Sequence, residues 1–294
     1  MPLVTIGIPV YNEERFLEKT ILAAINQTFS DLEIVISDNA STDGSAEIIK
    51  KYQRIDNRIK PILKATNEGP GANFSTLVAH TKSKYFVLLG AHDIFLPDYI
   101  EKAVTFLESN PDYVMAYPHS NFIDADDNHT GCCDSDIDTS GLDVSRRMKK
   151  VAEDLSWCTC VHGVFRSEVV RKIPNMKIRG GDQLMLFAAA YYGHLRFLDG
   201  LGILRREWRG DASEVIEQRR IQLGMYEETG SRLFDAYAVM SMEHLRFLFN
   251  KTTLSLYKKI LLSISLLPIF KRGHGTRASS IVFAYLNRQK SVSY

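Results

Sequence analysis

The chain has 294 residues, of which 45% are hydrophobic and 24% are charged. This composition is typical of a globular protein, and the length is sufficient to bury a large core, which excludes disordered and fibrous classes. Four cysteines, two adjacent and two in a C-x-C pattern, form neither a disulfide framework nor a paired zinc motif, so reduced thiols are expected. The first residues lack the basic stretch and apolar run of a secretory signal, which indicates a cytoplasmic protein.

The net charge of +1 hides an asymmetry along the chain. Residues 251–294 contain eight Lys or Arg and no Asp or Glu, which leaves 28 basic and 35 acidic residues in the remainder. A basic segment on an acidic body indicates a separate role for that segment.

The first hundred residues alternate apolar runs with amphipathic stretches. Strands are predicted at residues 3–8, 32–36, 59–63 and 85–89, with helical patterning between them. The fourth run is almost wholly apolar, so it is expected to be central and covered on both faces. Strand–helix alternation of this kind predicts a three-layer, Rossmann-like, mostly parallel α/β sheet.

Polar segments follow each of these four strands. They cover residues 9–13, 38–43, 67–71 and 90–93. In parallel sheets, ligands bind beyond the carboxyl ends of the strands. The four segments are therefore expected to converge on one crevice.

The middle and last parts of the chain show other patterns. Strands are predicted at residues 113–117, 120–123 and 161–166, a helix at residues 183–192, and long helical stretches over residues 212–250. Seven aspartates lie between Asp124 and Asp143, where the spacing begins like a calcium loop. The required glycine is His129 and the closing glutamate is Ser135, so a solvated loop is expected instead.

Several motifs occur in an order and spacing that resemble family-2 glycosyltransferases. They are Pro9-Val10-Tyr11-Asn12-Glu13, Gln27-Thr28, residues 37–44, Gly90-Ala91-His92-Asp93, residues 96–100, residues 121–124, residues 162–166 and Gly181-Asp182. The resemblance covers about residues 3–210. It implies a glycosyltransferase A fold in residues 1–210, with a nucleotide-binding half (1–98) and an acceptor-binding half (99–210), followed by a helical C-terminal region (211–294).

The resemblance implies that a nucleotide-sugar donor binds at the polar segments, with UDP as the default nucleotide. The expected donor-binding residues are Pro9, Tyr11, Glu13, Asp38, Asn39, Asn67, Gly69, His92 and Arg206. A carboxylate or amide at the end of the second strand can pair with the polar edge of a pyrimidine, and Tyr11 offers a flat face beside it. Helix capping for Asp38, simple packing for Tyr11 and a surface charge cluster for Arg206 are the alternatives.

The family's metal motif is usually D-x-D, whereas residues 90–93 keep only the last carboxylate. The resemblance implies a divalent metal, Mn²⁺ or Mg²⁺, at Asp93, where it would neutralise the leaving diphosphate. His92 either ligates this metal, contacts a phosphate or is a hydrogen-bonded loop histidine. The departure from the motif leaves metal dependence open.

The resemblance assigns the catalytic base to Asp182. In the implied inverting mechanism, Asp182 takes the proton from a hydroxyl of a glycan or lipid-linked acceptor, as in bacterial surface polysaccharide synthesis. That hydroxyl then attacks the anomeric carbon in line. The alternative role is an N-cap for the helix that begins at Gln183.

Residues 254–270 form the most apolar run of the chain. The run is shorter than the ~20 residues that a spanning helix needs, and Lys258-Lys259 interrupt it. An amphipathic helix in the membrane interface is expected, with basic residues of the segment 251–277 facing anionic headgroups. Packing on the catalytic body or in a homodimer is the alternative, and no nucleic-acid partner is expected.

Two other functions remain open. A catalytically weakened sugar-nucleotide-binding or scaffolding homologue of the same fold is motivated by Gly90 and His92, which stand where aspartates are usual. A nucleotidyltransferase on a similar core is disfavoured, because residues 9–13 contain neither a glycine nor a basic side chain.

Overall fold

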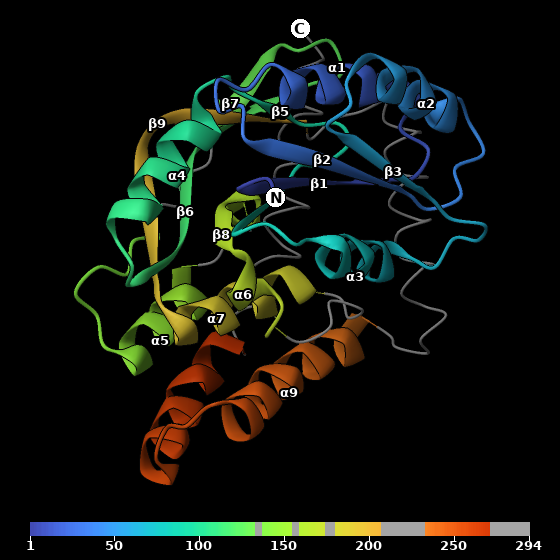
Figure 1. The fold of residues 1–294 in the computed structure, drawn as a ribbon. Coiled ribbons are helices and arrows are strands. Elements are labelled where there is room, and N and C mark those ends of the chain that lie inside the picture. Colours follow the sequence, from blue (N-terminus) through green and yellow to red (C-terminus); the bar gives the residue numbers. More distant parts are fainter. Residues whose placement is uncertain (133–136, 155–158, 174–179, 207–232, 271–294) are drawn as a thin grey trace, which may run out of the picture.

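The computed structural model describes residues 1–132, 137–154, 159–173, 180–206 and 233–270. Within these ranges the chain forms a nine-stranded sheet with helices on both faces (Figure 1). The strands are β1 (Val4–Val10), β2 (Leu32–Asp38), β3 (Ile59–Leu63), β4 (Tyr85–Leu88), β5 (Ile94–Phe95), β6 (Tyr113–Ile123), β7 (His129–Cys132), β8 (Val164–Arg166) and β9 (His194–Arg206). The helices are α1 (Glu14–Ile25), α2 (Ser45–Ile55), α3 (Pro70–His80), α4 (Tyr99–Ser109), α5 (Val144–Asp154), the 3-10 helix η1 (Thr159–His162), α6 (Ser167–Val170), α7 (Gly181–Tyr192), α9 (Leu233–Lys251) and a helical segment at residues 256–270.

The sheet is parallel in its first half and mixed in its second. Strands β3, β2, β1 and β4 are adjacent in that order and all run parallel. Beyond them β8 pairs antiparallel with β4 and β6, whereas β6 and β9 pair in parallel. The predicted α/β class with a C-terminal helical extension is confirmed, and the parallel pairing applies to the four strands that precede the polar segments.

Side chains on the two faces of the sheet enter two separate cores. Along β4, Phe86 enters the core beside α3, whereas Val87 enters the core beside α1 and α4. This alternation follows from the two-residue period of a strand and confirms that the fourth strand is covered on both faces. In Figure 1, α1 and α2 lie above the sheet, and α3 lies below it.

Three predicted elements differ from the structure. The two strands predicted at residues 113–117 and 120–123 form one strand, β6, whose register against β9 shifts after Pro118 because β9 carries the extra residues Asp199 and Gly200 there. The strand predicted at residues 161–166 covers only Val164–Arg166 and follows the 3-10 helix. The helix predicted from Gln183 begins at Gly181, so Asp182 lies inside its first turn.

The C-terminal helices pack on α7. The ring of Phe187 in α7 lies 4.8 Å from His244 and 6.3 Å from Phe247 in α9. In the segment 256–270, Leu262 and Leu266 are buried in the same core. The part of the predicted helical stretch 212–250 that precedes α9, residues 212–232, lies outside the described residues. The predicted division into domains stays a prediction. None of the described helices has both the length and the apolar character needed to cross a bilayer.

A buried amide holds α3 against the ends of β1 and β2. Asn73 Nδ2 donates to the carbonyl oxygens of Ser37 at 2.9 Å and Val10 at 3.4 Å, and Asn73 Oδ1 accepts from Ser37 Oγ at 2.6 Å. Asn73 is 2% exposed. These bonds satisfy backbone groups at the point where the parallel ladder stops.

Replacing Asn73 by alanine is expected to lower the free energy of unfolding by about 2–3 kcal/mol, because buried carbonyls lose their donor. Urea denaturation measures this change. The matched control is Thr76→Ala on the same helix, whose hydroxyl bonds only within the helix and whose removal should leave stability nearly unchanged. Equal stability of wild type and Asn73→Ala would contradict the assignment.

The buried side chain of His244 makes the stability of the fold depend on pH. Burial lowers the pKa of His244 to about 4. The unfolded chain takes up this proton below about pH 6.5, whereas the folded chain does not, so stability present above pH 6.5 is lost as the pH falls toward 4. Between pH 7 and 5, wild type should lose about 2 kcal/mol more than His244→Gln. Urea denaturation at both pH values measures the difference, and the exposed control His129→Gln should behave as wild type.

Candidate active site

The four polar segments after β1 to β4 are joined by hydrogen bonds, as predicted. The backbone N–H of Asn12 donates to Ser41 Oγ at 2.9 Å, which connects the first segment to the second. Asn39 Nδ2 donates to Asn67 Oδ1 at 2.5 Å, which connects the second to the third. His92 Nδ1 lies 2.9 Å from Glu13 Oε1, which connects the fourth segment to the first. The carboxyl ends of the parallel strands therefore carry one continuous polar network.

Asp38 and Asn39 form the buried centre of this network. Their exposed fractions are 3% and 2%. The Asp38 carboxylate accepts the Ser41 N–H at 3.3 Å and the Ser41 hydroxyl. Asn39 Oδ1 accepts the N–H of Glu68 at 3.1 Å, so Asn39 holds the third segment through both ends of its amide.

The remaining predicted donor residues lie in the same place. Pro9 pairs with Ser37 in the ladder, and the half-buried Tyr11 follows β1 directly. Gly69 has a φ of 82° and donates its N–H to Asn67 Oδ1 at 2.9 Å, so the turn needs a glycine. In the described residues, left-handed non-glycine backbone occurs at Asn12 and Ala40, within this network, and at Asp127, in the turn between β6 and β7. Strained backbone of this kind clusters at functional sites.

Asp93 points into the protein. It is 1% exposed, and its Oδ1 accepts the backbone N–H of Arg206 at 2.9 Å. A Cβ on Gly90 would come within 2.4 Å of Asp93 Oδ2, so the carboxylate occupies the space that any larger residue at position 90 would need. His162 Nε2 lies 3.5 Å from the same oxygen.

The electrostatic environment keeps Asp93 ionised. Burial alone would raise the pKa of Asp93, but the neighbouring His92, His162 and Arg205 side chains and the N–H of Arg206 together lower it. Burial also lowers the pKa of His162 to about 4, so this ring is neutral near pH 7. His162 Nδ1 lies 2.8 Å from the carbonyl oxygen of Leu88 at the end of β4.

As arranged, Asp93 does not fit the role of a metal ligand. Its carboxylate is turned toward Gly90 and Arg206, and His92 Nδ1 is bonded to Glu13. Among the residues with described positions, no three His, Cys, Asp or Glu side chains are grouped to hold a metal ion. The predicted metal role of Asp93 stays a prediction that requires its carboxylate to turn outward.

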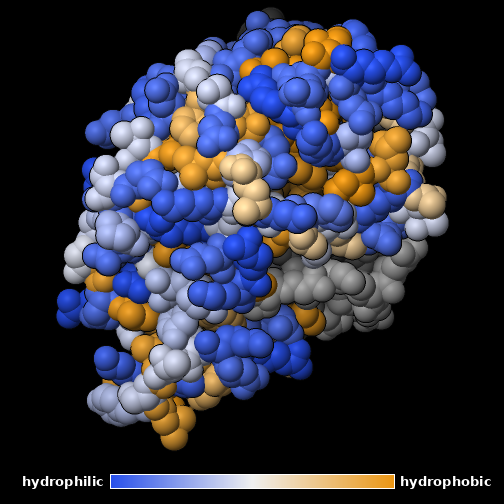
Figure 2. All heavy atoms as spheres, in the orientation of Figure 1, coloured by the Kyte–Doolittle hydropathy of each residue, from blue (hydrophilic) through white to orange (hydrophobic). Residues whose placement is uncertain are grey.

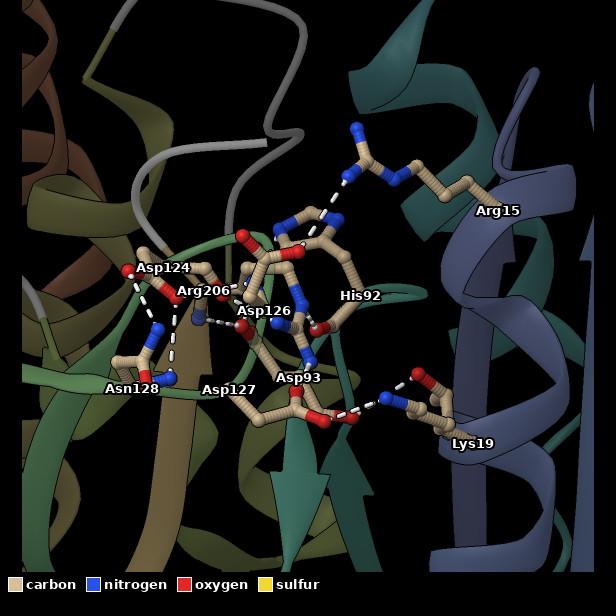
Figure 3. A network of polar contacts seen from close by, with 10 residues as sticks. Arg15, Lys19, His92, Asp93, Asp124, Asp126, Asp127, Asn128 and Arg206 are labelled. Carbon is tan, nitrogen blue, oxygen red and sulfur yellow. Dashed lines mark hydrogen bonds and ion pairs between the residues drawn. The ribbon is translucent and has the colours of Figure 1, made fainter. Parts of the chain in front are cut away.

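Arg206 connects four elements around this carboxylate (Figure 3). Its side chain is 0% exposed, its Nε donates to the carbonyl oxygen of His92 at 3.1 Å, and its guanidinium lies 4.6 Å from the ring centre of Phe16. The terminal nitrogens donate to the carbonyl oxygen of Asp124 and to the carboxylate of Asp127. Arg206 was expected either to reach a phosphate or to lie in a surface charge cluster. The structure places it in a buried internal contact, so a phosphate would have to displace protein partners.

The aspartate-rich turn between β6 and β7 is exposed to solvent, as expected, and is held by these contacts, whereas residues 133–136 of the loop lie outside the described residues. Asp124 Oδ1 accepts the N–H groups of Asp126 and Asn128 at 2.9 and 3.0 Å. Asp127 bonds Lys19 of α1 as well as Arg206 (Figure 3). Sequence reasoning missed Asp127, Lys19 and His162 as members of the site, and only His162 carried a signal, as part of a downstream motif.

Asp182 lies at the start of α7. It is half-buried, and its Oδ1 accepts the N–H of Gln183 at 2.9 Å. The helix is preceded by Gly180 in the left-handed conformation, against which Met240 of α9 packs. Asp182 therefore has the position of a first-turn carboxylate and not of an N-cap.

Comparison with known proteins gives a consistent result. The model of the family described as "Glycosyl transferase family 2" matches residues 5–173. An uncharacterized glycosyltransferase of Haemophilus influenzae is 34% identical over 128 residues, which are 44% of this chain and 51% of the relative. The chain thus spans about half the length of this relative.

Two solved structures have the same fold. TarS of S. aureus (residues 1–349) in complex with UDP-GlcNAc has a TM-score of 0.68 at 17% identity, over 90% of this chain and 72% of that one. The mannosyltransferase PcManGT of Pyrobaculum calidifontis, in complex with GDP-Man and Mn²⁺, has a TM-score of 0.53 at 16% identity, over 97% of this chain and 87% of that one. At these identities the likeness concerns the fold alone.

The inward position of Asp93 leads to a stability prediction. In EDTA, the free energy of unfolding of Asp93→Asn is expected to be about 3 kcal/mol lower than that of wild type, because a buried, hydrogen-bonded carboxylate is lost. Urea denaturation measures the difference, and Asp98→Asn, in a half-exposed ion pair nearby, is the control. If Asp93→Asn matched wild type in EDTA, and Mn²⁺ stabilised wild type and Asp98→Asn but not Asp93→Asn, Asp93 would be a metal ligand instead.

Proposed function

The chain belongs to glycosyl transferase family 2, and we propose that it transfers a sugar from a nucleoside-diphosphate sugar to an acceptor hydroxyl. The observation that supports this most is the single hydrogen-bonded network of the four segments after β1 to β4. Such a network at the carboxyl ends of parallel strands is where nucleotides bind in open α/β sheets. UDP is the proposed nucleotide.

We assign the base and ribose of the donor to the first three segments. Asp38 and Asn39 present buried oxygen and amide groups that are already fixed by Ser41 and Asn67, so little ordering is needed on binding. Tyr11, half-buried beside them, supplies a ring face. Pro9 and Gly69 shape the backbone at the edges of the same region.

We assign contact with the diphosphate to His92. Its Nδ1 is fixed by Glu13, which orients the ring, and its side chain keeps 19% exposure while Asp93 beside it has 2%. Since Asp93 is not arranged as a ligand, the proposed mechanism contains no step through Mn²⁺ or Mg²⁺. Arg206 then acts indirectly, because it holds the carbonyl oxygen of His92 and offers its own N–H to Asp93.

The proposed reaction is an in-line displacement. Asp182 accepts the proton of the acceptor hydroxyl as that oxygen bonds to the anomeric carbon. The bond between this carbon and the diphosphate oxygen breaks on the opposite side, so the configuration inverts. The Gln183 N–H bonded to Asp182 Oδ1 fixes the carboxylate and leaves its second oxygen for the acceptor.

Asp182→Asn tests this function. Donor turnover, measured as release of nucleoside diphosphate from a panel of sugar nucleotides, should fall at least about 100-fold, because an amide cannot take up the proton. The dissociation constant for the donor should stay unchanged in calorimetry. The matched control is Asp112→Asn, an exposed carboxylate that precedes β6.

Near-normal turnover in Asp182→Asn would reject the base assignment. A wild-type chain that binds sugar nucleotides but releases no nucleoside diphosphate from any of them would instead support the binding or scaffolding homologue. The replacement of metal-motif aspartates by Gly90 and His92 is the observation that keeps this second function under test.

A further inference from the structure

Exposed apolar side chains are concentrated on the two C-terminal helices. Of the thirteen large hydrophobic residues that are exposed in the described part of the chain, nine lie on α9 and on the segment 256–270. They are Val239, Met242, Phe249, Leu256, Tyr257, Ile260, Leu261, Ile264 and Leu267. Figure 2 shows hydrophobic spheres at the lower end of the molecule, where Figure 1 places these helices. Exposed apolar side chains gathered on one part of a molecule in this way indicate an interaction site.

The segment 256–270 has two apolar faces that lie on opposite sides of the helix. Leu262 and Leu266 are 4% and 0% exposed and form the face that packs on the protein. The six exposed apolar residues of this segment, taken at 3.6 residues per turn, fall within an arc of roughly 140° on the other side. Packing on the body therefore explains only the buried face, and the exposed face needs a partner.

The charges around the exposed face are basic. Residues 251–270 contain three lysines and no acidic residue, and Lys251 and Lys258 are exposed. At 3.6 residues per turn, Lys258 and Ser265 lie along one edge of the exposed apolar arc, and Ser263 lies along the other. An apolar face with a lysine and two serines at its edges, on a segment without acidic residues, has the composition of a helix that lies in a membrane interface.

We propose that the exposed face of the segment 256–270, together with the outward side of α9, docks on an anionic phospholipid surface. The apolar side chains would enter the boundary between headgroups and acyl chains, and the lysines would contact phosphate and carboxylate headgroups. A second copy of the chain fits less well, because a twofold contact through this face would bring lysines of both copies together.

The docked surface is connected to the acceptor side of the site. α9 packs on α7, and Met240 of α9 lies against Gly180, two residues before Asp182. A bilayer in contact with the C-terminal helices would thus lie next to the layer that carries the assigned base. This arrangement favours a hydroxyl on a lipid-linked acceptor as the substrate of the proposed transfer, although vesicle docking itself does not depend on that function.

Vesicle flotation of the full chain tests the proposal. Wild type should float with vesicles of phosphatidylcholine and phosphatidylglycerol and should bind pure phosphatidylcholine far less, and 0.5 M NaCl should weaken the binding. Lys251→Glu/Lys258→Glu should bind anionic vesicles at least about tenfold less tightly. Ile260→Asn/Ile264→Asn should lose a similar factor on anionic vesicles at any salt concentration.

Matched controls lie outside the two C-terminal helices. Ile55→Asn/Leu63→Asn replaces two apolar residues of comparable exposure, and Lys50→Glu/Lys82→Glu reverses two exposed charges. Both controls should float as wild type. Release of nucleoside diphosphate from the soluble donor should be unchanged in every variant, which separates loss of docking from loss of the proposed transferase activity.

Two outcomes would overturn the proposal. One is equal flotation of wild type and both helix variants. The other is a wild-type dimer in light scattering that becomes monomeric in Ile260→Asn/Ile264→Asn while no protein floats, which would assign the face to a second copy of the chain.

Discussion

The buried carboxylate of Asp93 is the constraint on which the site depends. A charge at this depth is tolerated only with bonded partners, and here the N–H of Arg206 supplies one directly. The same contact fixes the end of β9 against the loop after β4, and the Arg206 guanidinium then reaches α1 and the turn after β6. The loop after β4, the end of β9, α1 and the turn after β6 are consequently held together by one buried group and its neighbours.

The parallel half of the fold follows directly from the sequence. The runs at residues 32–36, 59–63 and 85–89 are short, β-rich and separated by amphipathic stretches, and each corresponds to an observed strand. The second half is less local, because β8 and β9 pair with strands distant in the chain. The sequence of the C-terminal run predicts an amphipathic helix. Which of its apolar side chains are buried depends on packing in the core that also contains residues of α7 and α9, so the two opposite faces could not be predicted.

The sequence predicts which segments form the site, but it does not predict where their side chains point or what they contact. Asn39 and His92 lie where strand ends place them, whereas the direction of Asp93 depends on the missing Cβ of Gly90 and on Arg206, 113 residues away. Likewise, Lys19 and Asp127 meet across 108 residues without any local pattern. Long-range pairing of this kind is set by tertiary packing, which a motif does not encode.

We propose that the joined segments after β1 to β4 bind a sugar nucleotide. Titration calorimetry of the purified wild-type chain with UDP-, GDP- and dTDP-sugars tests this most directly. We expect saturable binding of one of them, with one ligand per chain, and competition by the matching nucleoside diphosphate. A folded chain that binds none of the three, with or without Mn²⁺, would contradict it.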